Sequence, residues 1–101
     1  MKKYHGDKRF YKILKELAEI HSCKNYDYAG DDSLSNFKLS EKMGIPAWKG
    51  VLVRMSDKIS RLWSFAQKEK FEVADESVID TLKDLSIYAI LCILLYEDRK
   101  K

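Results

Sequence analysis

A stretch near the C-terminus, residues 76–96 (ESVIDTLKDLSIYAILCILLY), most constrains what this chain can fold into. It predicts one long helix whose second half, from Leu85 onward, is almost uniformly apolar. In the first half Glu76, Asp80 and Asp84 recur at steps of four residues, so they share one helix face within about 12 Å of rise. The face that carries these acids continues toward the C-terminus into apolar residues.

That continuation consists of Ile87, Leu91 and Leu94, which must be buried. The carboxylates are therefore expected to point into the protein interior or a subunit interface rather than into open solvent. Anions gathered there need cations, most simply a divalent metal ion. The alternative is that Asp80 and Asp84 lie at the edge of an interface and only make the helix soluble.

The chain length of 101 residues predicts a single domain, residues 1–101, with its core over about 8–98. Its 46% hydrophobic and 35% charged residues are ordinary for a soluble helical protein. The net charge of +3 comes from basic residues near the ends, which are more simply explained as solvated termini than as a polyanion site. No direct DNA binding is expected.

Targeting and redox signals favour a cytoplasmic location. Cys23 and Cys92 lack the paired spacing of a zinc site or a disulfide scaffold. The first ten residues contain no apolar signal region. The apolar run that ends at Tyr96 covers roughly 12 residues, fewer than the ~20 that a membrane span requires.

Apolar periodicity predicts an all-α bundle of three long helices and one short helix. The expected helices cover residues 8–24, 37–43, 47–70 and 76–96, with Asp7 as a cap, a loop over 25–36, a left-handed cap at Gly44 and Pro46 in the first turn of the third helix. So few helices cannot cover the last one on every side. We therefore expect a homodimer or homotetramer that buries Ile87, Leu91 and Leu94.

Two further groups of charged residues are candidates for function. Arg54, Lys58 and Arg61 form a basic stripe that could bridge a phosphate chain or pair with carboxylates of the last helix. Glu16 and Glu19 lie three residues apart on the first helix, where they could be surface partners of nearby lysines. The residue pattern leaves both alternatives open.

Three blocks of the sequence together resemble a phage and bacterial family, the nucleotide-modification-associated domain proteins. Residues 21–37 (HSCKNYDYAGDDSLSNF) resemble its H-x-x-K-N-x-D-Y-x-G…N-F signature, and residues 54–63 (RMSDKISRLW) its R-x-x-D-K-x-x-R block. Residues 75–91 (DESVIDTLKDLSIYAIL) resemble its D-E-S-x-x-D-T-L-x-D-L-x-x-Y-A block. The blocks occur in order, and the resemblance extends over about residues 10–96.

That family is similar to the MazG-like all-α nucleoside triphosphate pyrophosphatases, which bind magnesium through acids on two helices and cleave an NTP to an NMP and pyrophosphate. Their pattern is E-E-x-x-E on one helix and E-x-x-D on another. This chain differs, because its first helix offers only Glu16 and Glu19 and its last helix has acids at steps of four.

The resemblance implies a Mg²⁺- or Mn²⁺-dependent nucleoside or deoxynucleoside triphosphate pyrophosphohydrolase that acts on the nucleotide pool. Catalytic and metal-binding roles fall on Glu76, Asp80 and Asp84, with Glu19 or Asp27 as a further metal ligand. Oxygen ligands of this kind suit magnesium or manganese. The implied substrate-binding residues are Lys24, Arg54, Lys58 and Arg61 for phosphates, Asn25, Asp27, Tyr28 and Asn36 for the remainder of the nucleotide, and His21 for either part.

Two other functions remain open at this stage. The same scaffold could bind a nucleotide or a nucleotide-derived signal without turnover, which the incomplete E-E-x-x-E pattern favours. It could also be a helical interaction protein whose acids and bases only pair with one another. That second alternative leaves the signature of residues 21–37 without a role.

Overall fold

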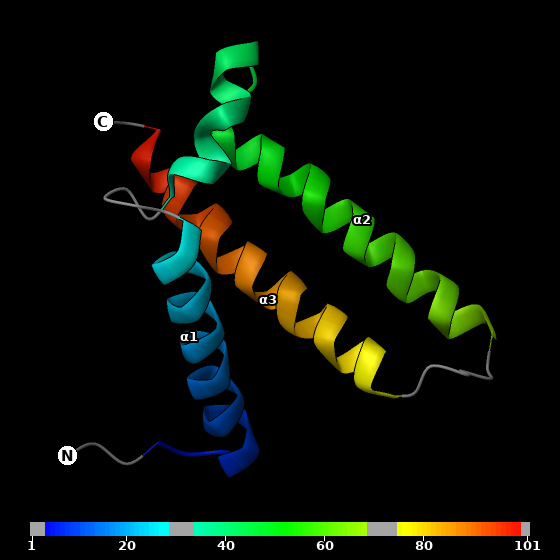
Figure 1. Ribbon diagram of the computed structural model, residues 1–101. Helices are drawn as coiled ribbons and strands as arrows, with labels where there is room; N and C mark the ends of the chain where they lie inside the picture. Colours follow the sequence, from blue (N-terminus) through cyan, green and yellow to red (C-terminus); the bar gives the residue numbers. More distant parts are fainter. Residues whose placement is uncertain (1–3, 29–33, 69–74, 100–101) are drawn as a thin grey trace.

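The computed structural model describes residues 4–28, 34–68 and 75–99, and the side chains of residues 25–28, 35–36 and 75–77 lie outside that description. Within the described residues all the regular secondary structure is helical and no strand is present, which confirms the all-α prediction. The elements are α1 (Lys8–Tyr28), the 3₁₀ helix η1 (Ser35–Met43), α2 (Ala47–Lys68) and α3 (Asp75–Asp98). Figure 1 shows α2 and α3 as an antiparallel pair, with α1 at a steep angle to α3.

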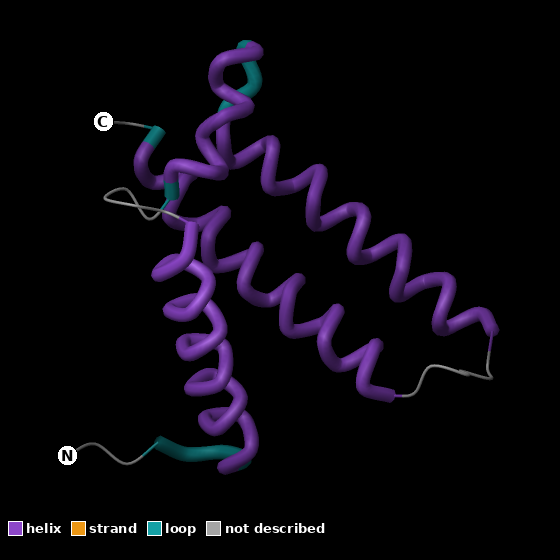
Figure 2. Tube along the Cα trace, viewed as in Figure 1, coloured by secondary structure: helices purple, strands orange, loops and turns teal. Residues whose placement is uncertain are grey.

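The ends of α1 differ in how well the sequence predicts them. The helix begins after Asp7, whose Oδ1 accepts a hydrogen bond from the backbone N–H of Arg9 at 2.8 Å, as expected of a cap. Its other end lies at Tyr28, so the predicted loop is wrong over residues 25–28, which are helical (Figure 2). These polar residues contain no glycine or proline, so nothing in them stops the helix from continuing.

The junction between η1 and α2 follows the predicted turn chemistry. Gly44 has a φ of 80°, the left-handed conformation that glycine adopts without strain, and its N–H donates to the carbonyl of Glu41. Pro46 directly precedes α2, and its carbonyl accepts the N–H groups of Lys49 and Gly50. The short helix predicted over residues 37–43 is present, although it starts two residues earlier and is a 3₁₀ helix.

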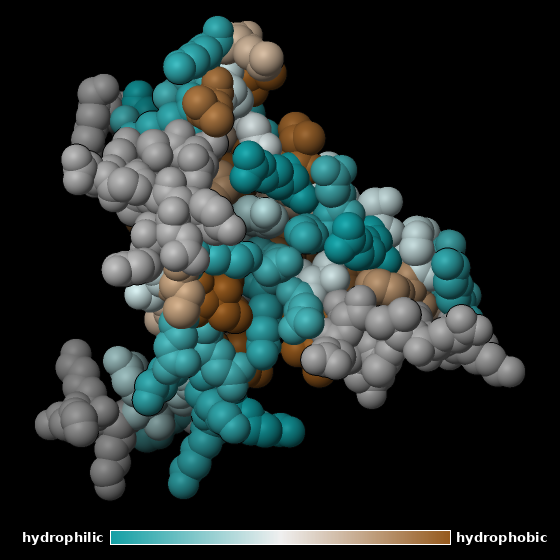
Figure 3. Space-filling view, viewed as in Figure 1, coloured by the Kyte–Doolittle hydropathy of each residue, from teal (hydrophilic) through white to brown (hydrophobic). Residues whose placement is uncertain are grey.

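The chain exposes more surface than a compact protein of its size. Its accessible area is 8436 Å², whereas about 5,900 Å² is typical of a folded monomer of 11.9 kDa. Its radius of gyration is 15.9 Å, compared with about 13 Å for a compact domain of 100 residues. Large apolar side chains remain exposed, among them Leu39 and Met43 of η1. Figure 3 shows hydrophobic surface in several separate places on one face of the molecule. A single chain thus leaves much apolar surface uncovered.

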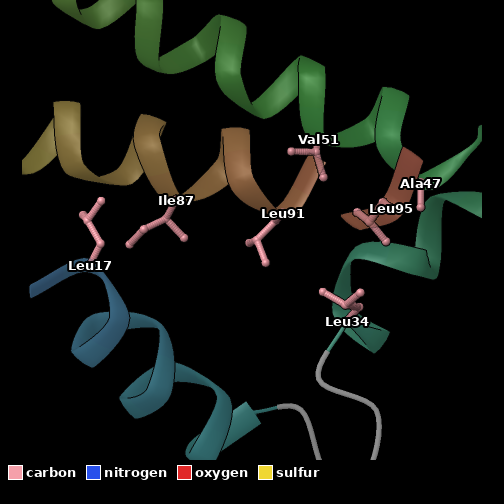
Figure 4. Packing of buried hydrophobic residues seen from close by; sticks show 7 residues of the cluster. All are labelled: Leu17, Leu34, Ala47, Val51, Ile87, Leu91 and Leu95. Carbon is pink, nitrogen blue, oxygen red and sulfur yellow. The ribbon is translucent and has the colours of Figure 1, made fainter. Parts of the chain in front are cut away.

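The core is correspondingly small. Within the described residues its buried hydrophobic members are Leu17, Leu34, Ala47, Val51, Ile87, Leu91 and Leu95 (Figure 4). They come from all three α-helices and from the residue that precedes η1, so this cluster is what joins the elements. At its edge the Cys92 thiol donates to the carbonyl of Trp48, and the Trp48 ring packs edge-on against Tyr96.

On α2 and α3, the burial of the predicted apolar faces differs from what the periodicity indicates. On α2, Val51 is buried, but the predicted face also includes Ile59 and Trp63, which are exposed. On α3, Ile87 and Leu91 of the predicted interface are buried within one chain, whereas Leu94 remains 40% exposed. Periodicity identifies apolar residues, but it does not say whether the covering surface comes from the same chain.

Candidate functional site

Asp84 lies where the three α-helices approach one another. Lys58 of α2 donates from Nζ to Asp84 Oδ2 at 3.2 Å, and the Nζ of Lys24 on α1 lies 3.8 Å from Oδ1. The Lys58 and Asp84 side chains are only 20% and 33% exposed. These three residues, here called the Asp84 cluster, come one each from the three sequence blocks that were expected to form a site.

A second ion pair lies next to this cluster and also joins α1 to α3. Lys83 Nζ is 2.9 Å from Glu16 Oε2. The hydrogen bond from Lys83 lowers the pKa of Glu16. The same bond, followed by the charges of Glu16 and then Asp80, raises the pKa of Lys83. Glu16 therefore has the lysine partner that the sequence allowed, and the partner comes from a different helix.

The carboxylates proposed as metal ligands differ in their surroundings. Asp80 lies one helical turn before Asp84 and is exposed, and Glu19 is an exposed residue of α1. Among the side chains that are described, no three His, Cys, Asp or Glu residues converge as a metal group. The side chains of Glu76 and Asp27 lie outside the described residues.

The donor chemistry of Asp80 and Asp84 still fits magnesium. Carboxylates at positions i and i+4 of a helix are neighbours, with about 5–6 Å between their Cβ atoms. Magnesium is commonly held by one or two carboxylates together with substrate phosphates and water, rather than by a complete protein cage. Asp80 and Asp84 would supply these two carboxylates, and the lysines beside Asp84 would face the phosphates.

The other predicted phosphate ligands lie along α2. Arg54, one turn before Lys58, places its guanidinium 5.0 Å from the ring centroid of Phe37, and Phe37 packs edge-on against Tyr88. Arg61 follows on the same helix and is exposed. The contact with Phe37 holds Arg54 close to η1, so it presents a positive charge on the α2 surface near the cluster.

His21 belongs to a different feature from the Asp84 cluster. It lines an apolar groove of about 270 Å³ between α1 and α3, with Leu14, Leu17 and Ala18 on one side and Ile87, Ile90, Leu91 and Leu94 on the other. The predicted nucleotide ligands Asn25, Asp27, Tyr28 and Asn36 have side chains outside the described residues. The described part of the site is thus a charged cluster beside an apolar groove.

Sequence reasoning missed Lys83 and Phe37. Lys83 directly precedes Asp84, and it faces α1 because the two residues are about 100° apart around the helix. Phe37 ends the first sequence block, and its aromatic face carries Arg54. For Lys83 the available signal was its position next to Asp84 in the sequence, whereas nothing in the sequence pairs Phe37 with Arg54.

Comparisons of the chain with models of protein families, with curated proteins and with solved structures give no match. The family resemblance therefore rests on the three sequence blocks alone. No helix in the described ranges is long and apolar enough to cross a membrane.

Proposed function

We propose that this chain is a Mg²⁺- or Mn²⁺-dependent pyrophosphohydrolase of nucleoside or deoxynucleoside triphosphates, MazG-like in fold and phage-associated, which acts on the nucleotide pool. The observation that carries the proposal is the Asp84 cluster. Lys24, Lys58 and Asp84 come from three separate sequence blocks, and their side chains meet at one point. Convergence of this kind supports a single site built from all three blocks.

The charges of the cluster suit a triphosphate. Lys24 and Lys58 supply ammonium groups, and Arg54, one turn before Lys58 on α2, is a partner for a phosphate oxygen. Asp80 and Asp84 would hold the divalent cation, and Lys24 and Lys58 would then bind the phosphate chain in place of the Asp84 carboxylate.

The reaction is hydrolysis of the anhydride between the α and β phosphates. One water is consumed, and the products are a nucleoside monophosphate and pyrophosphate. A bound divalent ion supplies charge neutralisation at the phosphoryl oxygens and activates the water. The chain's own contribution is to bind the triphosphate through its lysines and to hold the two aspartates one turn apart on the rigid helix α3.

A second candidate function is nucleotide binding, or sequestering of a nucleotide signal, without turnover. A specific observation favours it: each oxygen of Asp84 already faces an ammonium group, as in a structural ion-pair network. In this case Lys24 and Lys58 would release the Asp84 carboxylate and pair with a phosphate group of the nucleotide. Binding would then need no divalent ion.

The deciding assay is pyrophosphate release from the eight common NTPs and dNTPs, first with magnesium and then with manganese. The enzyme proposal predicts release that a chelator abolishes, with a loss of at least about 100-fold in kcat/KM for Asp80→Asn and Asp84→Asn, as for loss of a metal ligand. Glu97→Gln, an exposed acid near the C-terminal end of α3, is the matched control and retains activity. Circular dichroism verifies that the variants fold.

Other outcomes separate the alternatives. Thermal stabilisation by a nucleotide with no pyrophosphate from any substrate would reject the enzyme and support the binding protein. Neither stabilisation nor turnover across the panel would reject both proposals, and the Asp84 cluster would then be an ion-pair network that only joins the helices.

A further inference from the structure

Helix α3 carries an exposed apolar face in addition to the faces that contact α1 and α2. Its residues, here called the α3 ridge, alternate at spacings of three and four: Ile79, Leu82, Ser86, Ala89, Ile93 and Tyr96. The four large members are between 44% and 59% exposed. Alternation of three and four is the spacing with which two helices pack along a common seam. No member of the ridge is charged.

The chemistry of the ridge suits burial. Exposed apolar surface of this extent is uncommon on monomers and marks sites of interaction. Its polar member, Ser86, already donates a hydrogen bond to the carbonyl of Leu82 at 2.8 Å, so its hydroxyl would not be left without a partner in an interface. No ridge residue is charged, although the Arg99 guanidinium lies 3.4 Å from the centroid of the Tyr96 ring at one end of the ridge. The ridge thus lacks the row of basic residues with which proteins contact a nucleic acid.

The α3 ridge is complementary to the same ridge of a second copy that runs in the opposite direction. In an antiparallel pair of α3 helices with a two-fold axis between Ser86 and Ala89, three kinds of layer form: Ser86 meets the partner's Ala89, Leu82 meets the partner's Ile93, and Ile79 meets the partner's Tyr96. Small residues lie at the centre, where the helix axes come closest, and large apolar residues lie on both sides. Such reciprocal contacts are what a two-fold interface requires.

We infer that a second copy of this chain covers the α3 ridge in a two-fold, antiparallel dimer. The excess of exposed area over a compact monomer, about 2,500 Å², is spread over all the helices, and it leaves room for an interface of the standard ~800 Å² on each partner. Asp84 is two residues, or about 200°, away from Ser86 around the helix. The dimer therefore leaves the Asp84 cluster accessible, and the inference stands independently of the proposed function.

The first test is the mass in solution, measured by sedimentation at micromolar concentration. We expect wild type at twice the 11.9 kDa of one chain, and Ile93→Lys at the mass of one chain because the variant places a charge in the seam. Ile59→Lys is the matched control: Ile59 is also exposed, at 54% compared with 59% for Ile93, but it lies on α2. It remains dimeric. A monomeric wild type, or a dimer broken by Ile59→Lys and not by Ile93→Lys, would overturn the inference.

The second test reads the register directly, and it does not depend on how well the lysine variants fold. Leu82→Cys and Ile93→Cys are introduced together in a Cys23→Ser, Cys92→Ser background. Positions 82 and 93 are about 16 Å apart along one helix, too far for a disulfide within a chain. Mild oxidation should give a covalent dimer from the double variant and none from either single variant. If the double variant forms no covalent dimer, or if the single variants cross-link equally well, the antiparallel register is wrong.

Discussion

Asp84 illustrates what single residues reveal and what they leave undecided. The spacing of the acids on the last helix indicated that they need cations, and it left open whether a metal or the basic stripe of α2 supplies them. Within the described residues Lys58 and Lys24 take that position. The spacing along one helix could not decide this, because the partners of Asp84 depend on the angles at which α1 and α2 meet α3.

The Glu16–Lys83 pair gives a prediction at the residue scale. Because Lys83 lowers the pKa of Glu16, the pair stabilises the fold fully above the usual pKa of 4.5 for glutamate, and its contribution is lost as pH falls through the lowered value. Because Glu16 raises the pKa of Lys83, the contribution is complete below 10.5 and is lost as pH rises through the raised value.

Urea unfolding across this pH range measures the effect. We expect Glu16→Gln to be less stable than wild type by a constant amount between the two limits, and the difference to vanish in acid. Glu19→Gln, an exposed acid of the same helix, is the control and changes stability little at any pH. A Glu16→Gln deficit that persists in strong acid would mean that the ion pair is not its cause.

At the scale of elements, the termini with a chemical signal were predicted best. Asp7 and Gly44 cap helices as expected, because a side-chain acceptor and a left-handed glycine act locally. The end of α1 was predicted four residues too early, because polar composition was taken as evidence for a loop. Composition alone does not terminate a helix when no residue in the stretch opposes it.

The contact between η1 and α2 gives a prediction for Gly50. An added Cβ at this position would lie 2.9 Å from Ser40 Oγ and 3.3 Å from Ser40 Cβ, closer than packing allows. Gly50→Ala should gain about 1 kcal/mol in helix propensity and lose about 1–3 kcal/mol through overpacking, for a net destabilisation. Denaturant midpoints of the single variant and of Ser40→Ala/Gly50→Ala measure the balance.

Removal of the Ser40 hydroxyl tests the same contact from the side of η1. Its Oγ is buried and has no hydrogen-bond partner among the described residues, so Ser40→Ala alone should be neutral or stabilising. The double variant, which removes the clashing oxygen, should recover most of the stability that Gly50→Ala loses. Were Gly50→Ala more stable than wild type by itself, η1 would have to pack less closely on α2 than the structure shows.

At the scale of the whole molecule, the predicted helical class is confirmed, and the predicted homodimer or homotetramer stays a prediction. That prediction counted Ile87 and Leu91 as interface residues, whereas the chain buries them itself. Leu94, the third residue of the predicted interface, remains 40% exposed, and the large residues of the α3 ridge on a neighbouring face are also exposed. Which apolar face is left over depends on how the other helices pack, and a periodic pattern carries no information about that.

The central claim is that three helices build one phosphate-binding site at Asp84. The most direct test is an NMR titration of the ¹⁵N-labelled full chain with magnesium and a non-hydrolysable triphosphate analogue of the nucleotide that stabilises the protein most. We expect the largest amide shifts around Lys24, Lys58 and Asp80–Asp84, on all three helices at once, and we expect Lys58→Met to weaken them. Shifts confined to one helix or to η1, or no shifts at saturating analogue, would contradict it.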